Sequence, residues 1–371
     1  MIEKRSEHLS KVRHLVVKLG TQLLSDTEKR LDVDFISTVA KQVAILRERK
    51  IRVTIVSSGA VGAGLRELNL LKRPTDLAKL QAVAAVGQRR LMDVWAGAFA
   101  AHQLPVAQIL LTREDVDDRT RYLNLRNTIA AVHELGAVPI INENDTVSTD
   151  EIVKITFGDN DILAALVSRA LGADLLILMT VVDGIQDDVG KSVRLVENIE
   201  AARQLVRTEK SALGKGGMSS KVEAARLVTE AGEAMIVADG RTPDLLQRLL
   251  DGEELGTLFI PVNRRMSSRS RWISSARPVG TITVDDGAAG ALTRSNKSLL
   301  PAGITSVSGT FHAGDVVAIA APDGRIIARG LTNYASADTL RILGKKTADI
   351  RTLLGDAAYD EVIHRDNLVV E

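Results

Sequence analysis

The sequence contains no cysteine and very few aromatic residues, and both absences exclude classes of function. Without cysteine the chain forms no disulfide and has no thiol nucleophile, iron–sulfur cluster or cysteine-ligated zinc. Aromatic residues make up 3% of the chain, too few for a surface on which single-stranded bases stack. The six histidines include no two at the spacing of a metal pair on one helix.

An excess of one charge and long apolar runs are missing as well. The chain has 48 Lys and Arg against 47 Asp and Glu, so no global field attracts nucleic acid or an anionic membrane. No apolar run approaches the roughly 18 residues that cross a bilayer, and the N-terminus lacks the apolar segment of a signal peptide. With 371 residues, 45% of them hydrophobic, we expect a cytoplasmic protein of two or three domains.

Residues 1–260 alternate short apolar runs with segments of helical period. The runs are His14–Lys18, Arg52–Val56, Pro105–Leu110, Val138–Ile141, Leu175–Met179 and Ala234–Val237. Each run is nearly continuous, which is typical of parallel strands covered on both faces. Gly136, Gly172 and Gly232 each separate a helical segment from a strand, as expected of the left-handed residue that ends a helix. The pattern predicts a three-layer α/β/α sandwich with a mainly parallel sheet.

The pattern changes after residue 259. Residues 259–284 hold five Arg, five Ser and no acid, and we predict a linker at 261–278, with an exposed basic strip as the alternative. Residues 279–371 contain short β-like segments separated by turns that carry Gly, Pro or Asp. They predict a small β-rich domain with a C-terminal tail.

Two glycine-bearing stretches follow predicted strands, where open α/β sheets bind ligands. In Val17–Thr21 (VKLGT), Lys18 supplies a cation beside a glycine, although a strand-end lysine in solvent is an equally good interpretation. In Ser57–Gly64 (SSGAVGAG), small residues at a helix start offer N–H groups to a phosphate or carboxylate. A tight turn with close helix packing is the alternative. The stretch fits neither the common P-loop nor the dinucleotide-binding pattern.

Three further stretches place polar side chains where such sheets bind ligands. Residues 142–145 (NEND) and 158–161 (GDND) gather amides and acids that can hold an amino group, orient lysines or coordinate Mg²⁺. Helix capping explains only one or two of them. Residues 214–221 (GKGGMSSK) have the glycines, hydroxyls and lysines of a nucleotide phosphate cradle, with a surface loop as the alternative.

Together these stretches indicate phosphoryl transfer. That reaction needs positioning and positive charge rather than covalent chemistry from the protein. If the acceptor is a carboxylate, with a pKa of about 4.3, it is already ionised at neutral pH and needs no general base.

Several motifs, in this order, closely resemble the bacterial glutamate 5-kinases: VVKLGT, IVSSGAVGAG, QAVAAVGQRRLM, PIINENDTV, GDND and GGMSSK. The segment from RWISSARPVGTITVDDGA to VIHRDN looks like the PUA domain of that family. The resemblance implies the amino-acid-kinase fold and phosphorylation of the L-glutamate γ-carboxylate by ATP with Mg²⁺, the first step of proline synthesis. Another amino-acid or nucleotide kinase of the same fold is the alternative.

The resemblance also assigns residues to roles. It implies that Lys18 and Lys221 flank the transferring phosphoryl group and that Asp161 orients both lysines. Glutamate-binding positions are Ser58, Gly59, Asn142, Asp145 and Asn160. Positions for ATP are Lys18, Thr180, Val181, Lys215, Gly216, Gly217, Met218, Ser219, Ser220 and Lys221.

Two residues depart from the family pattern. Val181 stands where an acidic residue is familiar, so any nucleotide contact there uses the backbone. Lys215 stands where threonine is familiar and adds a cation beside the phosphates.

The family further implies proline as an inhibitor, a homo-oligomer and transfer of the product to glutamyl phosphate reductase. PUA domains elsewhere contact RNA. The segment from Pro278 to Glu371 has nine basic against eleven acidic residues, so we expect no nucleic-acid partner.

Overall fold

The structure is a computed structural model that describes residues 2–28, 30–147, 160–187, 190–209, 217–261, 266–345, 350, 353–354 and 359–371. The chain separates into two compact units, Met1–Arg265 and Met266–Glu371. Within the segment predicted as a linker, helix α12 (Ser268–Ser275) contacts strands of the second unit. The linker bounds of 261–278 stay a prediction.

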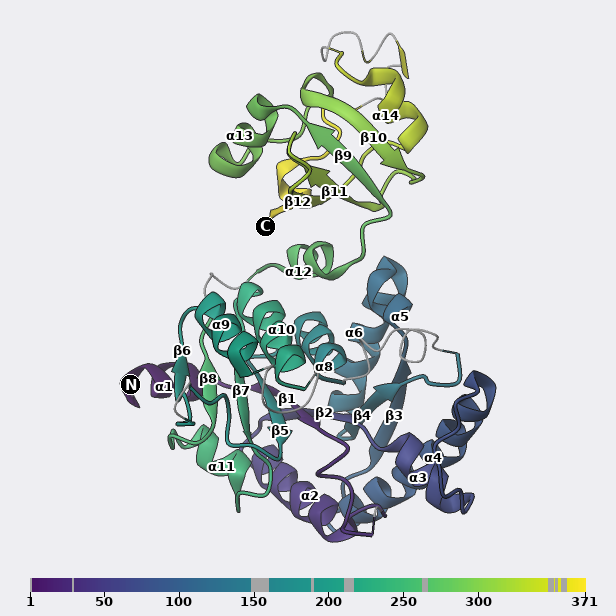
Figure 1. The fold of residues 1–371 in the computed structure, drawn as a ribbon, viewed down its shortest axis with the longest axis vertical. Helices are drawn as coiled ribbons and strands as arrows, with labels where there is room; N and C mark the ends of the chain where they lie inside the picture. The colour runs from purple at the N-terminus through teal and green to yellow at the C-terminus, as the bar shows by residue number, and fades with distance from the viewer. Residues whose placement is uncertain are drawn as a thin grey trace. The chain divides into compact units, whose positions relative to one another are not determined.

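An eight-stranded sheet forms the centre of the first unit, in the order β3-β4-β2-β1-β5-β7-β8-β6 (Figure 1). The strands are β1 (His14–Leu19), β2 (Arg52–Ser57), β3 (Val106–Leu111), β4 (Val138–Glu143), β5 (Leu175–Thr180), β6 (Leu195–Val196), β7 (Ala234–Asp239) and β8 (Thr257–Phe259). β8 is antiparallel to β7 and parallel to β6, and the other neighbouring pairs are parallel. The six strands predicted from apolar runs are thus confirmed.

Helices cover both faces of this sheet. On one face Leu15, Val17 and Leu19 share a core with α2 (Val33–Glu48), α4 (Leu77–Ala100) and α11 (Leu245–Leu250). On the other face Val16 shares a core with α6 (Arg119–Glu134), α8 (Asn160–Leu171) and α10 (Gly217–Glu230). Successive residues of a strand point to opposite faces of the sheet, so the residues on both faces are apolar where helices cover both. This confirms the three-layer sandwich.

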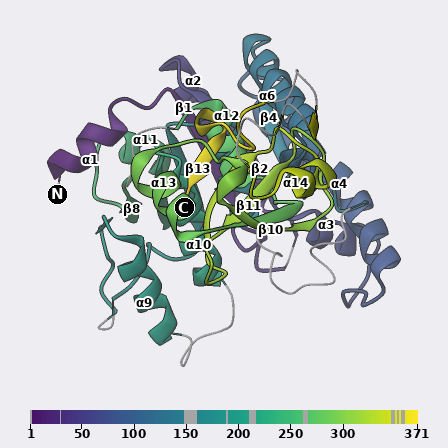
Figure 2. The ribbon, with the colours of Figure 1, turned by 90° about the horizontal axis from the view of Figure 1, so that it is seen from above.

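Glycines end the helices and set one close helix contact. Gly136, Gly172 and Gly232 all have positive φ, as the sequence predicts. Helix α3 (Ala60–Glu67) lies beside α4 in both views (Figures 1 and 2). A Cβ on Gly64 would overlap the Val83 carbonyl, and one on Gly87 would overlap the Ala60 carbonyl. Only glycine allows the two helices to lie this close.

The remaining helices of the first unit are α1 (Ile2–Leu9), α5 (Arg113–Asp117) and α9 (Ile199–Glu209). Helix α1 lies beside the edge of the sheet formed by β6 and β8 (Figures 1 and 2). There the buried Arg5 side chain donates to the carbonyls of Arg194 and Leu255. Burial lowers the pKa of Arg5. Among the residues described, no helix is long and apolar enough to cross a membrane.

The second unit contains a five-stranded sheet in the order β10-β9-β11-β12-β13. Its elements are β9 (Gly280–Val284), α13 (Asp286–Ser295), the 3₁₀ turn Pro301–Gly303, β10 (Ile304–Gly309), β11 (Val316–Ala320), β12 (Ile326–Leu331), α14 (Ser336–Ile342), the 3₁₀ turn Arg365–Asn367 and β13 (Leu368–Val370). β9 and β11 pair in parallel, and the other pairs are antiparallel. The prediction of a small β-rich domain is confirmed.

Candidate active site

A cavity of about 890 Å³ opens at the carboxyl ends of the central parallel strands. The chain places β2 on one side of β1 and β5 on the other, so the cavity lies where the strand order reverses. Its size is typical of a small-molecule site. Nine residues predicted for the site line it: Lys18, Ser58, Gly59, Asn142, Asp145, Asn160, Thr180, Val181 and Lys221.

Asp161 holds two lysines at the base of the cavity. Lys18 Nζ lies 2.5 Å from Asp161 Oδ1, and Lys221 Nζ lies 2.9 Å from Asp161 Oδ2. Lys18 shares a sheet face with Val16 and so points toward α8, whose second residue is Asp161. Lys221 reaches the same carboxylate from the start of α10. The side chains of all three are buried.

The charges of this cluster do not cancel. Two ammonium groups and one carboxylate leave one net positive charge in a buried place. A buried ion pair is tolerable when its partners are close and hydrogen-bonded. The cluster is therefore suited to hold an anionic group such as a phosphoryl.

The start of α10 adds further polar groups. Ser220 lies in its first turn, and the Ser220 hydroxyl donates to Asp161 Oδ2 at 3.3 Å. Gly217, Met218 and Ser219 precede it in the same turn, where backbone N–H groups have no partner within a helix. Two of the predicted ATP positions, Lys215 and Gly216, lie outside the described residues.

A chain of amides forms a second polar cluster. Asn160 Nδ2 donates to the Ser57 carbonyl at 2.9 Å, to Ser58 Oγ at 2.8 Å and to Asn142 Oδ1 at 3.0 Å. Asn142 Nδ2 in turn donates to Gln88 Oε1 at 2.8 Å. The predicted residues Ser58, Asn142 and Asn160 are thus in direct contact, and they join β2, β4 and α8.

The sequence reasoning missed several residues at this site. Gln88 lies on α4 within the QAVAAVGQRRLM motif, but nothing in that motif shows that this polar side chain is buried. Trp95, one of two tryptophans, donates from Nε1 to Ser57 Oγ at 3.1 Å and supports the turn after β2. Arg73 and Thr75 line the cavity from the segment between α3 and α4, which has no recognisable motif.

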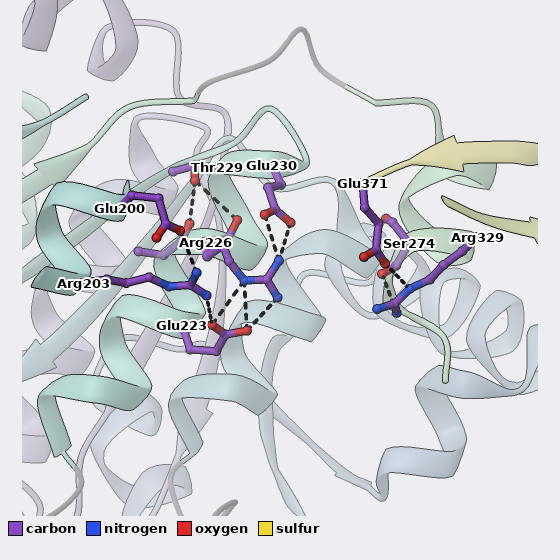
Figure 3. Close-up of polar contacts among 10 residues, drawn as sticks. Glu200, Arg203, Glu223, Arg226, Thr229, Glu230, Ser274, Arg329 and Glu371 are labelled. Atoms are coloured by element: carbon purple, nitrogen blue, oxygen red, sulfur yellow. Dashed lines mark hydrogen bonds and ion pairs between the residues drawn. The ribbon is translucent and has the colours of Figure 1, made fainter. Parts of the chain in front are cut away.

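Ion pairs connect the two helices that precede and follow residues 210–216 (Figure 3). Arg203 on α9 pairs with Glu200 at 2.6 Å and with Glu223 on α10 at 2.9 Å. Arg226 pairs with Glu223 at 2.6 Å and with Glu230 at 2.8 Å. Burial would raise the pKa of Glu223, but hydrogen bonds from Arg226 and Arg203 lower it below its usual value. The network holds α9 against the helix that carries Lys221.

Two histidines, His14 and His133, lie near the opposite, amino-terminal ends of the central strands. Thr54 Oγ1 lies 3.1 Å from His14 Nε2 and 3.0 Å from His133 Nε2. Burial, with smaller contributions from Arg52 and Arg47, lowers the pKa of His133 to about 4. This group lies at the amino ends of β1 and β2, so it serves the fold rather than the cavity.

Comparison with known proteins defines the class first. The model of the amino acid kinase family matches residues 13–239, and that of the PUA domain matches residues 280–354. An N-acetylglutamate synthase from Neisseria gonorrhoeae, solved with coenzyme A and N-acetyl-glutamate, matches with a TM-score of 0.50 at 16% identity. That match covers 70% of this chain and 62% of the other, and it bears on the fold alone.

Full-length relatives give the narrower family. A glutamate 5-kinase from Caldanaerobacter subterraneus is 43% identical over 364 residues, which cover 96% of this chain and 97% of the relative. Glutamate 5-kinases from Syntrophotalea carbinolica and Herpetosiphon aurantiacus are 42% and 45% identical over 378 and 363 residues. These matches cover 99% and 96% of this chain and 100% and 97% of the relatives. The chain belongs to the glutamate 5-kinase family.

Proposed function

We propose that this chain transfers the γ-phosphoryl group of ATP to the γ-carboxylate of L-glutamate, which gives L-glutamyl 5-phosphate and ADP. The observation that carries the proposal is the buried Asp161 carboxylate that holds Lys18 and Lys221 at the base of the cavity. The membership of the glutamate 5-kinase family supports the identity of both substrates.

The reaction needs no proton to be removed. A γ-carboxylate oxygen, already ionised at neutral pH, attacks the γ-phosphorus of ATP. One oxygen–phosphorus bond forms, and the bond from that phosphorus to the β,γ-bridging oxygen breaks, so ADP leaves with the electron pair. The lysines are proposed to offset the charge that spreads over the phosphoryl oxygens and the leaving oxygen, and Asp161 to keep both ammonium groups in place.

The two substrates are proposed to bind on opposite sides of Lys18. Asp145 and the oxygens of Asn142 and Asn160 are acceptors for the α-ammonium group of glutamate. Ser58 and Gly59, at the start of α3, offer donors to a carboxylate. The proposed ATP positions are Thr180, the last residue of β5, and Val181, the next residue in the sequence. They continue with Gly217, Met218, Ser219, Ser220 and Lys221 at the start of α10, and with Lys215 and Gly216, which lie outside the described residues.

Mg²⁺ fits this site as a companion of the nucleotide. Asp161 is engaged by two lysines, and the described part of the chain contains no cluster of three or more acidic or histidine ligands. Glu143 and Asp145 line the cavity as single carboxylates. A magnesium ion that keeps waters and phosphate oxygens as its main ligands, as Mg²⁺ prefers, is compatible with that donor set. When bound, the ion neutralises phosphate charge.

Four further properties are part of the proposal. They are inhibition by proline, a homo-oligomeric state, delivery of the labile acyl phosphate to glutamyl phosphate reductase and a cytoplasmic location. The family resemblance suggests each of them, and each needs its own measurement.

The test is ATP turnover with Mg²⁺ and L-glutamate, with hydroxylamine present to trap the acyl phosphate as a hydroxamate. Hydroxamate that depends on glutamate is the expected result, and its decrease with L-proline would support feedback inhibition. Turnover with aspartate or another acceptor, and none with glutamate, would leave the fold assignment and overturn the substrate.

A further inference from the structure

Gln88 lies in the AAVGQ segment of α4, which has no role in the proposed chemistry. Its side chain is 8% exposed, and its Oε1 accepts the hydrogen bond from Asn142 Nδ2 at 2.8 Å. Asn142 is 3% exposed, so water does not replace this bond if it is lost. Asn142 lines the substrate cavity, whereas Gln88 does not. Gln88 lines a neighbouring cavity of about 440 Å³ that shares Glu143 and Asp145 with the substrate cavity, and its hydrogen bond to the lining of the substrate cavity is the one from Asn142.

The hydrogen bonds of Asn160 determine what its amide can offer a ligand. Its nitrogen contacts three acceptors, the Ser57 carbonyl, Ser58 Oγ and Asn142 Oδ1, at 2.8 to 3.0 Å. An amide nitrogen has two hydrogens, so these three acceptors occupy it fully. Asn160 lines the cavity, and the group that its amide can present there is the carbonyl oxygen. Such an oxygen, in a cavity that Asp145 also lines, is an acceptor for an ammonium group.

The orientation of Asn142 decides whether this arrangement holds. A side-chain amide turned by 180° exchanges its oxygen and nitrogen with almost no change in shape. A turned Asn142 would place its nitrogen against the donor of Asn160 and its oxygen against Gln88 Oε1. Both contacts would be repulsive. The acceptor on Gln88 therefore favours one orientation of Asn142 and, through it, one orientation of Asn160.

The backbone at Gln88 is held in place by the preceding residue. Gly87 lies against the Ala60 carbonyl at the start of α3, in a contact that excludes any Cβ. Residue 60 directly follows the Ser58–Gly59 turn that lines the cavity. The same close helix contact thus positions the turn and the amide acceptor relative to each other.

We propose that Gln88 is a positioning residue that orients the Asn142–Asn160 amide pair, so that the cavity presents oxygen acceptors to the α-ammonium group of its amino-acid substrate. This inference rests on the proposed function, because it concerns how that substrate is recognised. It predicts that removal of the Gln88 acceptor weakens binding of the amino acid and leaves nucleotide binding unchanged.

The test compares Gln88→Met, which keeps the length and loses the acceptor, with Gln88→Glu, which keeps an acceptor oxygen. Loss of one well-formed buried hydrogen bond is expected to raise the KM for L-glutamate about tenfold in Gln88→Met, with the KM for ATP within about twofold. Gln88→Glu is expected to recover most of the affinity for glutamate. Gln81→Met, the same change two turns earlier on α4, is the control for effects on the helix.

An equal rise in both KM values, an unchanged KM for glutamate, or a Gln88→Glu variant as impaired as Gln88→Met would overturn the inference. If Gln88→Met does not fold, Gln88→Asn withdraws the acceptor by one methylene and allows the same comparison. A wild-type enzyme that phosphorylates a different amino acid would refute the proposed function, and the variants would then be compared on that amino acid.

Discussion

Replacement of Lys221 by alanine is expected to lower kcat strongly and stability only slightly, because two lysines share one carboxylate. Lys221 Nζ lies 2.9 Å from Asp161 Oδ2, and Lys18 lies 2.5 Å from the other oxygen. After Lys221→Ala, Asp161 still has Lys18 as its partner. The substitution therefore removes the net positive charge without leaving a buried carboxylate unpaired.

The two effects have different expected magnitudes. Loss of one preorganised donor to a charged transition state typically costs about 10²–10³ in kcat, or about 2.7–4 kcal/mol. The stability cost is expected to stay below the roughly 3–5 kcal/mol that follows when one partner of a buried pair is left alone. Asp161→Asn leaves both lysines without their carboxylate, and it should reach that range.

The assay is formation of the hydroxamate at saturating ATP and glutamate, alongside the melting temperature of each variant. Lys41→Ala, an exposed lysine on α2, is the control and should keep wild-type kcat. A kcat within about threefold of wild type in Lys221→Ala would refute the role that we assign to this lysine. Loss of activity in proportion to loss of folded protein would refute it equally.

Three other substitutions test separate features. Gly87→Ala forces a Cβ into the Ala60 carbonyl and should lower the free energy of unfolding by about 1–3 kcal/mol, which is a Tm decrease of roughly 4–10 °C. The control is Gly97→Ala, also on α4, where the space around the new Cβ is open and Tm should not fall. His133 has a pKa of about 4 in the folded state against 6.5 in the unfolded state, so the unfolded state takes up a proton first and stability falls as pH decreases between these values. His133→Gln should show a shallower loss of stability between about pH 7 and pH 5, measured by urea unfolding. The same slope of stability against pH in variant and wild type would contradict the neutral form of His133. Arg203→Met should lower the free energy of unfolding by up to about 1 kcal/mol at low salt and by less at about 0.5 M NaCl, since the ion pairs to Glu200 and Glu223 are partly exposed. A loss that does not depend on salt would mean that Arg203 stabilises the protein through packing of its aliphatic part and not through its ion pairs.

The sequence predicts the central sheet well because burial on both faces produces continuous apolar runs. The missed strands, β6 and β8, have two and three residues, which is too short for any periodicity to appear. Helices α13 and α14 were also missed, because in the second unit the turn signals dominate the pattern. Short elements form where the sheet already offers an edge, and this edge is a property of the tertiary structure.

The candidate site likewise has residues that the sequence reveals and one that it does not. Lys18, Asp161 and Lys221 could be proposed because each lies near the end of a strand or the start of a helix within a distinctive motif. Gln88 lies in the middle of a 24-residue helix, where the sequence does not reveal that this polar side chain turns inward to an amide. Its role depends on how α4 lies relative to β4, which no local sequence pattern gives.

The reversal of strand order at β1 has a consequence for the evolution and redesign of this enzyme. The residues proposed to recognise the acceptor come from β2 through the first turn of α8, and those proposed for the nucleotide follow β5. Apart from Lys18 of the central strand, which precedes both in the sequence, the two sets lie in separate stretches of chain. An exchange of residues 52–160 with another kinase of this architecture could therefore replace the acceptor while the donor half is inherited intact.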